Sequence, residues 1–166
     1  SKGRLAVTHH LKDQKHIEGL IHCAGIIEPI SPLRTLDEAG WRDILETNLT
    51  VPFLLTQSLH EKLIGGRVIQ VSSHFAHTPV SALAPYCISK RAVSVLINCW
   101  QLESPEIAST SVLPGVVNTA MPTIVHGSKH IEAKQRQIIQ NLKDNNQLIS
   151  PETVASFFSW LLLDVD

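Results

Sequence analysis

The sequence predicts an α/β domain in which helices cover both faces of a doubly wound parallel sheet, and three observations predict it. Short apolar runs alternate with longer helical patterns along the chain. Small residues or proline follow several of these runs, as they do where a strand ends. The chain has 166 residues, about the length of one domain, and contains no repeat or long linker. We therefore expect residues 1–166 to form one domain.

The expected strands are short. Residues 4–8 are predicted as the first strand and 17–23 as the second, which Ala24-Gly25 closes. The β-branched run 67–71 reads as a buried strand, and 111–113 as a further one ended by Pro114-Gly115. Ligands of parallel α/β sheets bind outside the carboxyl ends of the strands, so we expect the functional residues there.

Thr35-Leu36-Asp37-Glu38 has the pattern of a capping box, with Thr35 as N-cap and Glu38 reaching back to it. It predicts a long helix to about Leu63. Pro52 interrupts that helix, because proline removes a backbone donor near its middle.

Three further helices are expected in the second half. One runs from about Tyr86 to Leu102, and a polar one spans about 128–143. Ser150 is predicted as the N-cap of the last helix, because Pro151 suits the first helical position.

The composition excludes several classes of protein. The chain is 43% hydrophobic and 17% charged, which does not fit a disordered protein. Its net charge of −1 gives no basic excess, so we expect no nucleic-acid partner. No apolar stretch approaches the ~20 residues that span a bilayer, so we expect no membrane partner. Three widely spaced cysteines suit a reducing compartment, and we expect a cytoplasmic location. The nine histidines lack metal-ligand spacing, so we expect no metal.

A small set of polar residues stands out by position. Ser73 follows the strand 67–71, Tyr86 is the only tyrosine, and Lys90 lies four residues after it on the same helix face. Asn48 lies in the helix interrupted by proline. Structural roles stay open: Tyr86 packing under a loop, Ser73 ending a strand, or Asn48 marking a helix irregularity.

These residues belong to longer motifs. Val71-Ser72-Ser73, then Tyr86-Cys87-Ile88-Ser89-Lys90, then Pro114 to Thr119 occur in the order of the short-chain dehydrogenase/reductase family, which this chain resembles. Ala24-Gly25 resembles the second half of that family's Asn-Asn-Ala-Gly motif, and Trp41 to Asn48 its asparagine-bearing helix. Two motifs are most similar to the sepiapterin and benzil reductase branch of the family. They are Tyr86-Cys87-Ile88-Ser89-Lys90 and Ser150-Pro151-Glu152, which opens the last helix.

The resemblance implies hydride transfer between a nicotinamide cofactor and a carbonyl or alcohol substrate. Tyr86 would be the general acid in reduction, and Lys90 would lower the pKa of its phenol. Lys90 would also bond the nicotinamide ribose, and Ser73 would hold the substrate oxygen. Asn48 would help to place a water that relays protons to Lys90.

The resemblance also implies a cofactor, NAD(P), with NADP favoured. Tyr86 and Lys90 would contact it, and so would Ala24, Gly25, Pro114, Gly115 and Thr119. Thr119 could instead simply cap a short helix. An apolar lid after Pro114-Gly115, containing Met121, Pro122, Ile124, Val125 and His126, suits a hydrophobic carbonyl compound. A homodimer or homotetramer is expected through the helices 37–63 and 86–102.

The chain departs from the family pattern at both ends. No Gly-x-x-x-Gly-x-Gly turn for the cofactor's pyrophosphate precedes residue 5, and the family's last strand is missing after 163. The expected fold is therefore an incomplete Rossmann-like one. Residues 5–8 resemble the third family strand, with Ala6 where an aspartate is usual, and a shortened or absent helix would follow. His22 and Cys23 replace the motif's two asparagines.

Three explanations of these departures stay open. The chain could be part of a longer enzyme, which we favour; another chain could supply the missing strands; or it could be a truncated, non-catalytic interaction or regulatory protein on the same fold.

Overall fold

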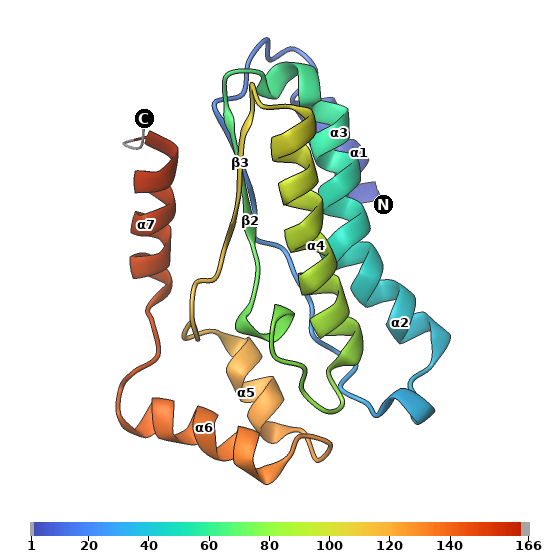
Figure 1. Cartoon of the computed structure of the whole chain (residues 1–166), viewed down its shortest axis with the longest axis vertical. Helices are drawn as coiled ribbons and strands as arrows, with labels where there is room; N and C mark the ends of the chain where they lie inside the picture. Colours follow the sequence, from blue (N-terminus) through green and yellow to red (C-terminus); the bar gives the residue numbers. More distant parts are fainter. Residues whose placement is uncertain (1, 164–166) are drawn as a thin grey trace.

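The structure is a computed structural model that describes residues 2–163, and within them it confirms an α/β fold (Figure 1). A parallel sheet has the order β1 (Gly19–His22), β2 (Arg67–Val71), β3 (Ala108–Val112). The prediction for β2 is confirmed in both bounds. Its β-branched residues are the reason, because Val68 and Ile69 are both buried at the centre of the sheet.

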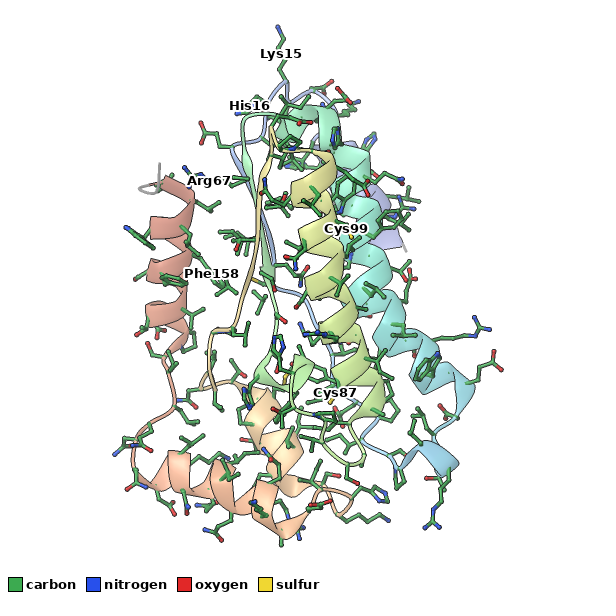
Figure 2. All side chains as sticks on the ribbon, in the orientation of Figure 1. Lys15, His16, Arg67, Cys87, Cys99 and Phe158 are labelled. Atoms are coloured by element: carbon green, nitrogen blue, oxygen red, sulfur yellow. The ribbon has the colours of Figure 1, made fainter. Side chains whose placement is uncertain are left out.

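Helices cover both faces of the sheet, as predicted. The helices are α1 (Lys2–His10), α2 (Glu38–Leu45), α3 (Val51–Leu63), α4 (Ala84–Glu103), α5 (Ala120–Gly127), α6 (Ala133–Asp144) and α7 (Pro151–Leu163). Figure 1 shows α3 and α4 on one side of the strands and α7 on the other. Phe158 extends from α7 toward the sheet (Figure 2), and Arg67 donates to the carbonyl of Leu161 over 2.9 Å. These contacts hold α7 on its face.

The predicted first strand is wrong, because residues 4–8 lie in helix α1. Arg4, Thr8 and Leu11 are half-buried, whereas Leu5 and Val7 of the apolar run are exposed. Inward positions spaced three to four residues apart are the periodicity of a helix. We therefore withdraw the likeness of this segment to the third family strand. The comparison of Ala6 with the aspartate of that strand is withdrawn for the same reason. A helix of nine residues therefore precedes β1, where we had expected a shortened one or none.

The long helix after residue 35 is present but begins later and contains an irregular turn. Asp37, not Thr35, is the N-cap, and its carboxylate accepts a hydrogen bond from Gly40 N over 2.7 Å. Thr35 instead ends a 3₁₀ turn (Leu33–Thr35). Between α2 and α3 the backbone forms a π-helical turn, Glu46–Thr50, directly before Pro52. The proline thus accompanies a local widening of the helix, a turn type that often marks functional sites.

The expected polar helix at 128–143 is α6, and a separate helix, α5, precedes it. The N-cap prediction for α7 is confirmed, since Ser150 Oγ accepts from Thr153 N over 3.1 Å. A second 3₁₀ turn, His74–Ala76, follows β2.

Two apolar clusters form the core. The first gathers residues around Tyr86 with α5 and α6; its buried members are Ile27, Leu83, Tyr86, Cys87, Val125, Ile131 and Ile139. The second lies between the sheet and the helices α3 and α4; its buried members are Leu59, Leu63, Val68, Ile97 and Ile107. Helix α4 contributes to both clusters. Among residues 2–163, no helix is long and apolar enough to cross a membrane.

Candidate active site

The carboxyl end of β2 and the first turns of α4 bring the predicted catalytic side chains together. Residues at helical spacing on α4, Tyr86, Lys90 and Val93, face inward. Lys90 is 3% exposed, and its Nζ donates to the carbonyl of Val71 over 2.9 Å. The last residue of β2 therefore anchors the ammonium group.

Tyr86 lies between this lysine and the turn after β2. Its side chain is 5% exposed, and Lys90 Nζ lies 5.8 Å from its ring centroid. The ring of Phe75 meets it edge-on, with centroids 6.5 Å apart. Ser73 is the N-cap of the 3₁₀ turn, and its Oγ accepts from Phe75 N over 3.2 Å. The Ser73 O–H then remains available to the phenol, with which it forms a hydrogen bond that lowers the phenol pKa.

Burial governs the electrostatics of the pair. Burial raises the pKa of the Tyr86 phenol, and the hydrogen bond from Ser73 only partly opposes it. Burial also lowers the pKa of Lys90 to about 8, while the nearby Cys23 thiol acts in the opposite direction. The pKa of Tyr86 thus responds to burial, Ser73 and Cys87, and its lowering by Lys90 stays a prediction. Burial has the largest effect on the pKa of both groups, because both lie inside the protein.

Asn48 lies in the π-helical turn and is fully buried. Its Oδ1 accepts from Ile26 N over 2.9 Å, and its Nδ2 donates to Ile26 O over 2.9 Å. The second Nδ2 hydrogen is donated to Ser89 Oγ over 3.0 Å. Both amide hydrogens are thus used within the protein, which leaves neither for the water we expected Asn48 to place.

The loop after β1 approaches the same group. A Cβ on Gly25 would lie 3.3 Å from Lys90 Nζ and 3.4 Å from Asn48 Oδ1. Ala24 beside it is exposed. The close packing of Gly25 explains a residue without a side chain here. The structure therefore brings the predicted cofactor contact Gly25 to the predicted catalytic residues Asn48 and Lys90.

The segment after β3 is built differently. Gly115 has φ of +79°, a conformation that favours glycine, and Thr119 follows as an exposed residue at the N-cap position of α5. The Thr119 hydroxyl makes no capping hydrogen bond, so the simple capping role does not account for it. Pro114 is half-buried beside Gly115. Among the described residues, no hydrogen bond joins Thr119 to Tyr86 or Lys90.

The two residues that replace the motif's asparagines also differ. His22 is 7% exposed, and its Nε2 forms a hydrogen bond of 2.8 Å with Thr56 Oγ1. Burial lowers the pKa of His22 to about 4, so the ring is neutral at pH 7. Cys23 is exposed. His22 thus joins β1 to α3 as a neutral hydrogen-bonding group. Among residues 2–163, no three His, Cys, Asp or Glu side chains gather as a metal site.

Sequence reasoning missed Ser89 as a site residue, although it lies inside the Tyr86–Lys90 motif. Its side chain is fully buried and contacts Asn48 from a helix 41 positions further along the chain. The available signal was a small polar residue at i+3 from Tyr86 on the inward helix face. Gln70 of β2 was missed as well. It is fully buried, and its Nε2 donates over 3.0 Å to Val71 O, the carbonyl that also accepts from Lys90.

A hollow on the described surface lies elsewhere. It measures about 710 Å³ and runs along α2 and the π-helical turn, lined by Glu38, Trp41, Arg42, Asp43, Leu45, Glu46 and Thr50. None of the predicted site residues lines it. Tyr86 is instead covered by the first apolar cluster, against which Met121 and Ile124 of the expected lid pack.

Comparison with known proteins places this arrangement in a family. The family model described as short chain dehydrogenase matches residues 3–128. An uncharacterized oxidoreductase of Schizosaccharomyces pombe is 29% identical over 170 residues, which cover 98% of this chain and 68% of that protein. A benzil reductase of Bacillus cereus, named as (S)-benzoin forming, is 28% identical over 86% of this chain and 61% of its own length.

A solved structure shows the same fold. The crystal structure of the KRED1-Pglu enzyme superposes with a TM-score of 0.90 at 25% identity, covering 96% of this chain and 68% of that one. The chain thus spans 61% to 68% of the length of these three proteins. Because the family model matches most of its residues, and the strands and helices superpose closely, the chain belongs to the short-chain dehydrogenase family.

Proposed function

We propose that the protein is an NAD(P)(H)-dependent oxidoreductase that reduces a carbonyl group, or oxidises the matching alcohol, by hydride transfer. The observation that carries the proposal is the meeting of three groups at the carboxyl end of β2. The Ser73 hydroxyl bonds the Tyr86 phenol, and Lys90, anchored on Val71 O, lies 5.8 Å from the same ring. A proton donor, a hydroxyl and a cation at one strand end suit chemistry on a carbonyl oxygen.

Each of these residues has its own role in the proposed reaction. When bound, the nicotinamide ring supplies or accepts the hydride at the substrate carbon. Tyr86 donates its phenolic proton to the substrate oxygen as negative charge develops there. Ser73, whose hydroxyl also bonds the Tyr86 phenol, donates a hydrogen bond to the same oxygen. Asn48 holds the loop after β1 through the two hydrogen bonds to Ile26.

The raised pKa of Tyr86 favours the direction of reduction. A phenol whose pKa lies above its ordinary value stays protonated near neutral pH, and only the protonated form donates. Abstraction of a proton from an alcohol needs the phenolate, which burial disfavours. The structure therefore supports carbonyl reduction as the main activity, with alcohol oxidation at higher pH.

The site fits a nicotinamide nucleotide, the cofactor that this family binds. The Lys90 ammonium has three N–H donors, and the described structure pairs one of them with Val71 O. Beside it Gly25, which has no side chain, lets the loop after β1 pack against Lys90 and Asn48. Thr119 keeps its hydroxyl outside any cap bond. We propose that Ala24, Gly25, Tyr86, Lys90, Pro114, Gly115 and Thr119 contact the cofactor, with NADP preferred by resemblance to the reductase branch.

The surroundings of Tyr86 support an apolar carbonyl substrate. Phe75 meets the ring edge-on, and Met121 and Ile124 pack against the cluster that contains it. A carbonyl compound bearing aromatic or aliphatic groups would bury its apolar surface against these residues. The substrate's oxygen would be the group that reaches Ser73 and Tyr86.

The outer face of α4 supports self-association. Ile88, Val95 and Leu102 recur every seven residues on it and are 45%, 51% and 82% exposed. An apolar stripe of this kind favours helix-to-helix pairing. We propose a homodimer or homotetramer that uses this face, which Val95→Glu should dissociate in sedimentation experiments. The free thiols Cys23, Cys87 and Cys99 suit our prediction of a cytoplasmic location.

The test is turnover of NADPH and NADH with a panel of diketones, aryl ketones and pterin-like carbonyls. Tyr86→Phe keeps the ring and its contact with Phe75 but removes the proton donor. We expect it to lower turnover by roughly 10² to 10⁴. A Tyr86→Phe variant that keeps most of the activity would contradict the assignment.

A further inference from the structure

Ser89 connects two elements of the site through a single hydroxyl. Its Oγ donates to the carbonyl of Tyr86 over 2.8 Å and accepts from Asn48 Nδ2 over 3.0 Å. The residue is 0% exposed, and so is Asn48. The hydrogen bonds therefore lie in a dry interior, where a donor that loses its acceptor finds no water to replace it.

A serine bonded to a carbonyl of its own helix is common and needs no special role. Ser94 on the same helix does so, since its Oγ donates to Lys90 O over 2.9 Å. Ser94 otherwise contacts Ser72 and Ser111, at the strands. Ser89 differs because its second partner is the asparagine of the π-helical turn. The contact with Asn48 is thus a link between α4 and another part of the site.

The link continues to the loop after β1. Asn48 uses its remaining amide hydrogen and its Oδ1 on Ile26, the residue that follows Gly25. Gly25 in turn lies against both Lys90 Nζ and Asn48 Oδ1. A chain of hydrogen bonds therefore runs from the backbone of Tyr86, through Ser89 and Asn48, to the proposed cofactor loop.

We propose that Ser89 is a positioning residue: its hydroxyl holds Asn48, and through it the Gly25–Ile26 loop, in register with the Tyr86–Lys90 turn of α4. The inference rests on the proposed function, because the register matters only if that turn and that loop meet the same substrate and cofactor. Ser89 touches neither in this role. Its loss would change the alignment of Tyr86 and Lys90 with the loop and leave the groups themselves in place.

The first experiment needs no activity. Amide hydrogen exchange of Ile26 is measured by NMR in the parent chain, in Ser89→Ala and in Ser94→Ala. Ile26 N–H donates to Asn48 Oδ1 and lies 63 positions from Ser89. Ser89→Ala should speed its exchange roughly fivefold, the equivalent of one hydrogen bond, while Ser94→Ala should not. Unchanged exchange in Ser89→Ala, or an equal rise in Ser94→Ala, overturns the proposal.

The second experiment isolates the hydroxyl. Ser89→Thr and Ser89→Val have the same shape as each other, so any cost of the added methyl groups is common to both. Ser89→Thr should keep slower Ile26 exchange and a higher kcat than Ser89→Val, by roughly fivefold, with equal KM for the carbonyl substrate. Equal exchange and equal kcat in the two variants overturn the role of the hydroxyl.

The two proposals fail separately. If Tyr86→Phe keeps its turnover, the catalytic assignment fails whatever the exchange data show. If Tyr86→Phe loses turnover but Ser89→Val matches Ser89→Thr in kcat and exchange, only the positioning role of Ser89 fails.

Discussion

The end of β2 with α4, and the segment that follows β3, hold their candidate residues in opposite ways. Lys90 is buried and bonded to Val71 O, and the Asn48 side chain makes three hydrogen bonds within the protein. Thr119, by contrast, is exposed and makes no side-chain cap bond. The difference indicates that the protein alone organises the proposed proton-transfer half of the site, whereas we propose that the other half is ordered by the ligand it meets.

After Tyr86→Phe, the largest effect should come from Lys90→Met, in the organised half. The substitution removes the cation next to Tyr86 and should lower turnover by roughly 10² to 10³. The fold should survive, because replacing a buried charge by an apolar side chain of similar length removes its desolvation cost. Lys143→Met is the matched control: its exposed ammonium bonds Thr123 and no site residue, so turnover should stay unchanged. Equal turnover in both variants would show that Lys90 has no part in the reaction.

A pH series tests the buried His22, which lies at the end of β1. The folded pKa of His22 is about 4 and its ordinary value is 6.5, so the unfolded chain takes up the proton first as pH falls. The contribution of neutral His22 is complete above pH 6.5 and is lost as pH falls toward 4, by about 3 kcal/mol. Urea unfolding of the parent and of His22→Gln between these pH values measures it. Parallel curves for the two proteins would be evidence against a buried neutral His22.

Gly25→Ala tests how closely the loop after β1 must approach the organised half. The new Cβ would lie within 3.4 Å of Lys90 Nζ and Asn48 Oδ1, so these neighbours must shift by a few tenths of an ångström. We expect NADPH affinity to fall roughly tenfold. Gly127→Ala places its Cβ where no atom lies within 4 Å and should leave affinity unchanged. A Gly25→Ala variant that binds like the parent would mean that the close packing is incidental.

The smallest effect should come from Thr119→Val, in the half where the candidate side chain makes no cap bond. Thermal stability should stay unchanged, because the hydroxyl makes no cap bond. Cofactor affinity should fall about fivefold, the equivalent of one hydrogen bond. Calorimetry of unfolding and of NADPH binding checks both values. A loss of stability in Thr119→Val would mean that this segment is organised by the protein after all.

The sequence predicted those parts of the fold whose local pattern permits one reading. The run at 67–71 is β-branched and ends in serines, and it forms β2 as expected. The apolar residues at 5–7 form an equally short run, but there the helix turns Leu5 and Val7 outward and packs through Arg4 and Thr8. A short apolar run cannot distinguish the two periods, because only the partner surface decides which residues are buried.

The same limit applied to the site. Tyr86, Lys90 and Asn48 could be predicted because motif order carries them. The raised pKa of Tyr86 could not, because it depends on how deeply α5 and α6 cover the ring. Ser89 was missed, because its partner Asn48 lies 41 positions away and no local pattern connects the two.

Helix α4 has a consequence for how the protein opens. It enters the first apolar cluster through Tyr86 and Cys87 and the second through Ile97, so one helix is anchored in both. If either cluster alone came apart, the end of α4 in the other cluster would stay packed. The amides between Tyr86 and Ile97 should therefore be among the slowest to exchange in the protein, released only in global unfolding. Tyr86, the proposed proton donor, would then stay in place for as long as the molecule remains folded.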